Sequence, residues 1–163
     1  MDESATSEVR QYVLFDLCGE EYGLPISRVQ SIIRFEPPTP VPHAPEGIEG
    51  VFNLRGQVLP LIDLGWRLRG EPIEPTPASR IIVAESAMGA VGLAVDMVRE
   101  VATLAVADIR PTPQAAVASE MTDALEGVAN YGERLIILLD TDKALPKPVF
   151  TATAVAQEAD PDV

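Results

Sequence analysis

The chain has 163 residues, 47% of them hydrophobic, so it is long enough for one folded domain with a buried core. It carries 12 Lys and Arg against 25 Asp and Glu, and the formal net charge of -13 disfavours binding to DNA or RNA, which would be repelled. No stretch approaches the roughly 20 apolar residues of a membrane span, and the first residues lack an apolar signal core. We therefore expect a cytoplasmic protein with no direct membrane insertion.

The first third of the chain predicts two strands and a stiff connection. Residues 1–8 are small and polar, and we expect a flexible tail there. Apolar residues alternate between Val9 and Leu17, which predicts a strand with one buried face. After a turn, residues 22–26 return as a second strand. Five prolines within 36–47 then favour an extended connection over a helix.

A hairpin pattern at 50–63 is the most prominent feature of the sequence. Two short apolar strands, 51–54 and 58–62, flank a tight turn that carries Arg55. Asp63 is placed to cap a short helix directly after the second strand. Because cations are scarce in this acidic chain, an arginine at a turn tip is a candidate contact for a partner.

The remaining segments continue the β pattern. Before the hairpin, the spacing of Val29, Ile32 and Ile33 fits either a short helical turn or the start of a strand. Beyond a second proline-rich connection, the sequence predicts strands at 80–84, 90–95 and 98–104. Residues 146–163 are rich in Pro, Ala and acidic residues, and we expect a disordered tail.

The chain also contains an internal repeat. It joins three pairs of segments: 22–26 with 91–95, 48–53 with 125–130, and 58–63 with 135–140. We therefore expect two related β units, roughly 13–69 and 80–145, each with about five short strands in the spacing of a small barrel. Neither unit is expected to be stable alone at this size, so the two should share a core. Arg55 occurs in one copy only, which favours a function at that turn.

Catalytic and metal-binding arrangements are not predicted. The chain has one His and one Cys, His43 and Cys18, and nothing in the sequence places them together. Zinc sites draw mainly on these two residue types, so we expect no metal, and no phosphate-binding motif is present. Asp63 and Asp140 occupy equivalent positions in the repeat and are interpreted as helix caps rather than a catalytic pair. We expect neither an enzyme nor a cofactor.

Several segments resemble the CheW-like domain of bacterial chemotaxis. They are F-D-L-C-G-E-E-Y-G at 15–23, G-V-F-N-L-R-G-Q-V-L-P-L-I-D-L at 50–64, V-G-L-A-V-D at 91–96 and I-R-P-T-P at 109–113. The match runs from about Val9 to Leu145, and the resemblance implies one CheW-like domain over 9–145 between two tails. It also implies an all-β fold, with two five-stranded SH3-like barrels packed together and a few short helices.

The resemblance implies a non-enzymatic scaffold. Such a protein couples the cytoplasmic tips of methyl-accepting chemoreceptors to the regulatory domain of the histidine kinase CheA, in arrays that its partners hold at the membrane. Arg55 would meet the acidic receptor tip, and Val29 would lie in an adjoining apolar groove between the barrels. Leu93 and Val95 would help to line this groove. Ser31 stands where the family commonly has a glutamate, so a charge-assisted hydrogen bond of about 1.5 to 3 kcal/mol is a possible loss.

Three other hypotheses stay open at this point. The chain could serve a divergent chemosensory pathway with an output other than motility. It could be a small-ligand-binding or hydrolytic β-barrel that uses the groove between the units, which ligand-induced thermal stabilisation would favour. It could also be a partner-binding module outside chemosensing that joins its target by strand addition at an exposed edge.

Overall fold

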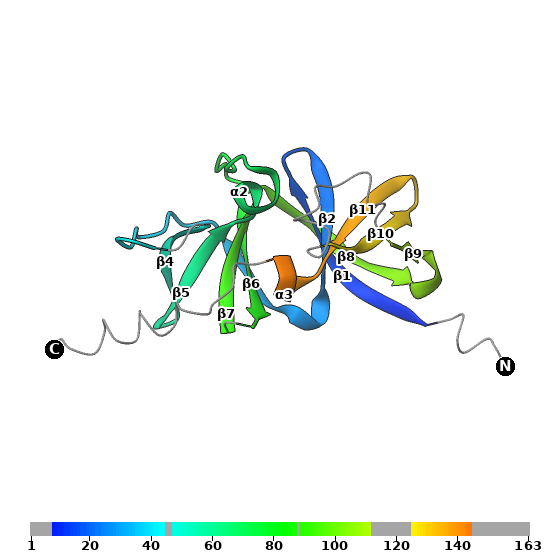
Figure 1. Ribbon diagram of the computed structural model, residues 1–163, viewed down its shortest axis with the longest axis horizontal. Helices are drawn as coiled ribbons and strands as arrows, with labels where there is room; N and C mark the ends of the chain where they lie inside the picture. The colour runs from blue at the N-terminus through cyan, green and yellow to red at the C-terminus, as the bar shows by residue number, and fades with distance from the viewer. Residues whose placement is uncertain (1–7, 45–46, 88, 112–124, 145–163) are drawn as a thin grey trace.

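The computed structural model describes residues 8–44, 47–87, 89–111 and 125–144. The two expected tails lie outside these residues, apart from Glu8. The described residues form two curled sheets, and they lie side by side along the long axis of the molecule (Figure 1). The all-β prediction is confirmed.

The first barrel is the five-stranded sheet. Its strands, in spatial order, are β3 (Val29–Arg34), β6 (Arg80–Ser86), β7 (Gly89–Val95), β5 (Gln57–Asp63) and β4 (Ile48–Leu54). The proline-rich connection closes it, because the Thr39 and Val51 backbones exchange two hydrogen bonds of 2.8 and 2.9 Å. Gly50 permits this close approach, since a Cβ atom there would lie 2.3 Å from the Thr39 carbonyl oxygen.

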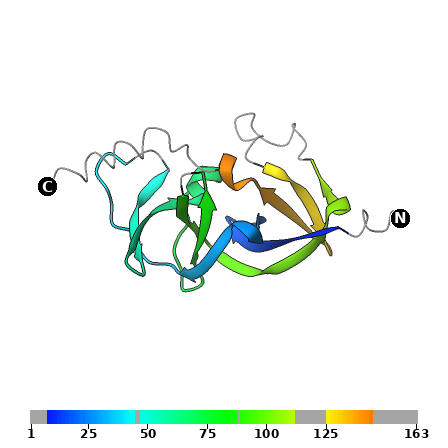
Figure 2. The same ribbon diagram turned by 90° about the horizontal axis from the view of Figure 1, so that it is seen from below.

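The second barrel is the six-stranded sheet. Its strands, in spatial order, are β8 (Met97–Ala105), β1 (Val9–Leu17), β2 (Glu20–Pro25), β11 (Arg134–Leu139), β10 (Leu125–Tyr131) and β9 (Ile109–Arg110). The sixth strand, β9, is only two residues long. Viewed from below, β8 and β1 run as long ribbons along the second barrel and reach toward the first (Figure 2).

In the described part of the chain, four short helices connect or follow the strands. They are η1 (Ile26–Arg28), α2 (Leu64–Arg69), η2 (Val106–Asp108) and α3 (Thr141–Ala144). The spacing of Val29, Ile32 and Ile33, which fitted a helical turn or a strand, belongs to a strand: all three lie in β3, and the helical turn η1 ends just before them. Asp63 caps α2 by accepting the Trp66 N–H at 3.0 Å, and Gly70 ends it in the left-handed conformation.

The sheets do not follow the order of the repeat. β1 and β2 belong to the first repeat unit but lie in the second barrel, and β6 and β7 belong to the second unit but lie in the first barrel. Two parallel pairs, β2 with β11 and β5 with β7, join the exchanged strands to their sheets. The boundaries 13–69 and 80–145 therefore describe the repeat and not the barrels. Parallel pairing between distant segments leaves no mark in a local pattern.

Strand β1 is buried on both faces, which corrects the expectation of one buried face. Val13, Phe15 and Leu17 point into the larger core, which fills the first barrel and the space between the barrels. Tyr12 and Leu14 point the other way, into the core of the second barrel. This arrangement arises because the six-stranded sheet forms the wall between the two cores.

Candidate functional site

Arg55 lies at the tip of the β4–β5 hairpin and is exposed. Its φ of 54° and the 87° of Gly56 give both central residues a positive φ, as a type I′ turn requires. The Asn53 side-chain oxygen accepts the Gly56 N–H at 2.9 Å and steadies the turn. A non-glycine residue in this conformation costs about 1–2 kcal/mol, so the turn holds its arginine at a cost to stability.

The Arg55 guanidinium makes no ion pair and no side-chain hydrogen bond within the residues that the structure describes. Five other arginines pair with carboxylates: Arg10, Arg28, Arg69, Arg99 and Arg134. Arg34 and Arg110 also make no ion pair and no side-chain hydrogen bond in the described part. They lie at the ends of β3 and β9, however, and not at the tip of a turn. Arg55 is thus a cation that is free to meet an acidic partner.

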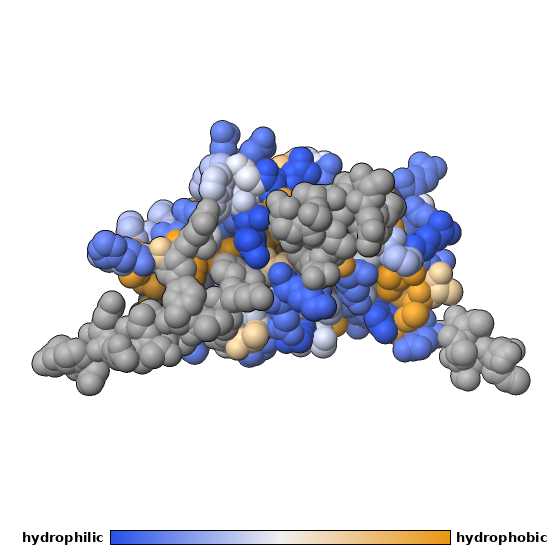
Figure 3. All heavy atoms as spheres, in the orientation of Figure 1, coloured by the Kyte–Doolittle hydropathy of each residue, from blue (hydrophilic) through white to orange (hydrophobic). Residues whose placement is uncertain are grey.

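The outer face of the same hairpin is partly apolar. Val58 lies opposite Asn53 in the β4–β5 ladder and is 62% exposed, while the next pair, Phe52 and Leu59, points into the core. On the face of the molecule in Figure 3, apolar surface gathers over the β4–β5 end and over the opposite end near β9, and most of the remainder is hydrophilic. An exposed aliphatic side chain beside a free cation suits a partner with both acidic and apolar groups.

Val29 and Ser31 lie together on β3. Both are half-buried; Val29 packs against the larger core, and the two residues pair with Ala84 and Val83 of β6. β3 and β4 form the two edges of the five-stranded sheet, so these residues and Arg55 come from opposite edges. The structure brings Val29 and Ser31 together but does not join them to Arg55.

Leu93 and Val95 do not line an open groove, which corrects the expectation from the resemblance. They are 1% and 0% exposed and belong to the larger core. Leu93 stands between Ile62 and Ile82 in the sheet, both of which are fully buried. These side chains pack between the barrels and leave no surface for a partner. The sequence did indicate this burial, because the run A-V-G-L-A-V at 90–95 is continuously apolar, and such a run is typical of a strand that is buried on both faces.

A set of polar contacts that the sequence did not predict ties α3 to the first barrel. The Arg28 guanidinium lies 2.8 Å from the Asp142 carboxylate, and Arg67 Nε donates to the Ala144 carbonyl at 2.7 Å. These contacts fix α3 between the barrels, next to η1 and α2 (Figure 1). No local pattern could have revealed pairs that lie 114 and 77 residues apart in the chain.

The buried carboxylate of Asp63 serves structure and not chemistry. It accepts the N–H groups of Trp66 and Ile73 and so ties α2 to the segment that follows it. Burial raises the pKa of Asp63, and its backbone hydrogen bonds act in the opposite direction. Asp140, its counterpart in the repeat, caps the start of α3 through the N–H groups of Asp142 and Lys143.

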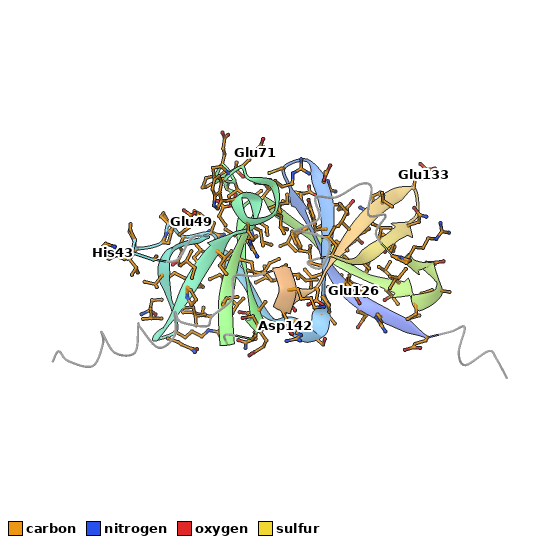
Figure 4. All side chains as sticks on the ribbon, in the orientation of Figure 1. His43, Glu49, Glu71, Glu126, Glu133 and Asp142 are labelled. Carbon is orange, nitrogen blue, oxygen red and sulfur yellow. The ribbon has the colours of Figure 1, made fainter. Side chains whose placement is uncertain are left out.

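His43 and Cys18 occupy unrelated positions. His43 is exposed in the proline-rich connection, at the far end of the first barrel in Figure 4. Cys18 lies in the β1–β2 turn, where its N–H donates to the Asp96 carboxylate at 2.8 Å. Among the residues described, no group of three or more His, Cys, Asp and Glu side chains is arranged to hold a metal ion. Within the same residues, no helix has the length and apolar character needed to cross a membrane.

Comparison with known proteins places this chain in a defined group. The CheW-like domain family model matches residues 11–148. A chemotaxis protein CheW of Rhizobium meliloti is 39% identical over 141 residues, which are 86% of this chain and 90% of that protein. The CheW of Bacillus subtilis is 32% identical over 145 residues, 87% of this chain and 92% of that one. The crystal structure of the scaffolding protein TtCheW from Thermoanaerobacter tengcongensis superposes with a TM-score of 0.77 at 34% identity, covering 86% of this chain and 94% of that chain.

Proposed function

The chain belongs to the CheW-like domain family, and from this premise we propose that it is a non-enzymatic scaffold that couples chemoreceptors to a CheA-type histidine kinase. It would work in the cytoplasm, where its partners hold it in receptor arrays at the membrane. Residues 9–145 would form one CheW-like domain. An adaptor role is the part of this proposal that the family supports directly.

Receptor binding would centre on the tip of the β4–β5 hairpin. The single observation that carries this proposal is the free guanidinium of Arg55, presented in a constrained turn beside the exposed side chain of Val58. A receptor tip that carries carboxylates and apolar side chains complements both groups. The net charge of the chain cannot draw an acidic receptor tip toward it, because the chain is negative overall and repels acidic partners at long range. A cation at the point of contact is therefore needed.

Val29 and Ser31 would form a second contact for the receptor. Val29 is half-buried at the edge strand β3, so a partner can reach part of its side chain. Ser31 offers a hydroxyl where the family resemblance leads us to expect a carboxylate. A hydroxyl makes a weaker hydrogen bond than a charged group does, so this contact should contribute less to binding than Arg55.

The test compares receptor binding by the wild type and by Arg55→Glu. We expect the affinity for a receptor cytoplasmic fragment to fall at least about tenfold, equivalent to roughly 1.4 kcal/mol, because a like charge replaces the complementary one. Arg110→Glu in β9 makes the same change of charge on the second barrel and should leave the affinity within about twofold. Equal binding by wild type and Arg55→Glu would show that the receptor contact lies elsewhere.

A further inference from the structure

A pocket opens at the mouth of the second barrel, away from the residues assigned above. It has a volume of about 370 Å³, at the lower end of the roughly 300–1,000 Å³ typical of ligand pockets. Four elements line it: the end of β2, the helical turn η1, the beginning of β1, and β10 through Glu126. Its residues are Arg10, Gln11, Tyr12, Pro25, Ile26, Ser27 and Glu126.

A β-bulge positions Glu126 at this mouth. In the β10–β11 ladder Leu125 pairs with Leu139 and Gly127 with Leu138, so Glu126 has no opposite residue. One carboxylate oxygen accepts from the Tyr12 hydroxyl at 3.4 Å, and the other lies 3.2 Å from the Arg10 guanidinium. Burial raises the pKa of Tyr12, and the Glu126 charge adds to it, so the hydroxyl keeps its proton and donates. Figure 4 labels Glu126 where β1 and β10 approach one another.

The beginning of β1 has a free edge next to this pocket. β2 ends at Pro25, opposite Tyr12, so residues 9–11 pair with β8 on one side and, among the strands that the structure describes, with none on the other. The Glu8 and Asp16 carbonyls accept hydrogen bonds from Val106 and Asp96, at the two ends of β8. Backbone groups of even-numbered residues therefore face β8.

Because successive residues of a strand direct their backbone groups to opposite sides, those of Val9 and Gln11 face the vacant side. A free N–H and C=O pair at this spacing is what an added strand requires. The matching pair of the first barrel, β6 and β7, leaves no such vacancy between its strands, because they pair from Arg80 with Val95 to Ser86 with Gly89.

We propose that this mouth binds an extended peptide segment of a partner protein, which adds to the free edge of β1 as a strand and places an uncharged aliphatic or aromatic side chain on Pro25 and Ile26. Ile26 is 38% exposed and, with the proline ring, gives that side chain an apolar surface. Arg10 and Glu126 neutralise one another at the rim, so the pocket offers no net charge to select a charged side chain. This site does not depend on which protein binds Arg55.

The probe is a set of acetylated peptides of alternating Thr and Val that carry Leu, Phe, Lys or Glu at one central position. We expect the Leu and Phe peptides to bind the full chain, with amide chemical-shift changes confined to Val9, Gln11 and the residues of η1. The Lys and Glu peptides should bind at least about tenfold more weakly. Methylating the peptide nitrogens that face β1 should abolish binding without any change to the protein.

Two protein variants test the two halves of the site. Gln11→Pro removes the free donor and spares the ladder with β8, as a proline at a strand edge can. Ile26→Glu places a charge on the apolar surface. Each should weaken binding of the Leu peptide at least about tenfold, whereas Val41→Glu, which changes an exposed valine in the proline-rich connection of the first barrel, should not.

Several results would overturn the proposal. They are binding of no peptide, equal binding of the N-methylated peptide, equal binding of the Lys or Glu peptides, and shift changes that map to another surface. The N-methylated peptide decides the question even where Gln11→Pro fails to fold, because it leaves the protein intact.

Discussion

The two repeat-related hairpins, β4–β5 and β10–β11, both close in a two-residue turn but differ in the conformation and the chemistry of their tips: both central residues of the first turn have a positive φ, and in the second only Gly132 does. Val58 and Leu135 occupy the same place after the turn and are 62% and 58% exposed. The first tip presents Arg55, which has no ion-pair partner among the described residues, whereas the second presents the exposed carboxylate of Glu133. Figure 4 shows Glu133 at the opposite end of the molecule from the residues labelled in the first barrel.

Arg134, the arginine of the second hairpin, makes its contacts within its own barrel. Arg134 lies 2.6 Å from Glu100 and 3.2 Å from Glu21, and its guanidinium stacks 5.1 Å from the Tyr131 ring centroid. This arginine is occupied by contacts within the barrel, and Arg55 is not. The comparison teaches that the fold requires the exposed hairpin but does not determine which charge it displays. The proposed receptor contact therefore rests on the tip and not on the barrel.

The largest expected effect is at the glycine that each hairpin packs against the backbone of another segment. A Cβ atom at Gly50 would lie 2.3 Å from the Thr39 carbonyl oxygen, and one at Gly127 would lie 2.5 Å from that of Arg110. Gly50→Ala and Gly127→Ala should each lower the free energy of unfolding by about 3 kcal/mol, as backbone clashes in closed barrels do. Gly50→Ala should cost more because its φ of 154° adds strain. Urea unfolding measures both. A loss under about 0.5 kcal/mol at only one of the two positions would show that Gly50 and Gly127 do not have equivalent structural roles.

A smaller effect is expected at the two helix caps, Asp63 and Asp140, whose substitutions should respond differently to pH. Burial raises the pKa of Asp63 above its ordinary value, so the folded chain holds this proton to a higher pH than the unfolded chain does. The stability that Asp63 contributes is therefore greatest at acid pH and decreases as the pH rises through its folded pKa. Asn cannot titrate, so the stability of Asp63→Asn relative to wild type should rise by up to about 1 kcal/mol from pH 3.5 to 7.

Asp140→Asn is the matched control for this pH dependence. Its carboxylate is half-buried and lies at the start of a four-residue helix, so the substitution should cost at most about 1 kcal/mol. Chemical denaturation at a series of pH values measures both variants. A difference between Asp63→Asn and wild type that stays constant with pH would contradict the assignment.

The smallest expected effect is a gain in stability at the first tip. Arg55→Asn creates the Asn-Gly pair that type I′ turns favour, because asparagine tolerates a positive φ better than arginine does. The variant should be more stable by a few tenths of a kcal/mol, up to about 1, while receptor binding falls as in Arg55→Glu. Thermal unfolding measures the first effect and a pull-down with receptor fragments the second. A destabilised variant would mean that Arg55 stabilises the turn, and its positive φ would then be no sign of function.

Local features of the fold could be predicted because they depend on neighbouring residues. The pattern at 50–63 predicted the strands that the structure extends by a few residues, and Asp63 marked the start of α2. The exchange of β1, β2, β6 and β7 between the barrels could not be predicted, because it depends on parallel pairs between distant segments. The repeat revealed related units and gave no information on how they interlock.

The candidate site likewise combines features that the sequence could predict with features that it could not. Arg55 was found from its place in a turn and from its absence in the second copy, and the structure adds that it is unpaired in the described part of the chain. The burial of Leu93 and Val95 depends on the second sheet, which covers them from the other side. The free edge of β1 arises because β2 ends at Pro25, opposite Tyr12, and does not reach the beginning of β1; only the register of the two strands reveals it.

The strand exchange also determines how the molecule loses its structure. Neither barrel is complete without strands from both repeat units, so the first cannot remain folded while the second unfolds. We expect a single cooperative transition, with slow folding because the pairs that close each sheet are distant in the chain. A ligand on either barrel would then protect both, by about 2.7 kcal/mol at a free concentration one hundred times its dissociation constant. Two partners at opposite ends would thus stabilise one indivisible body.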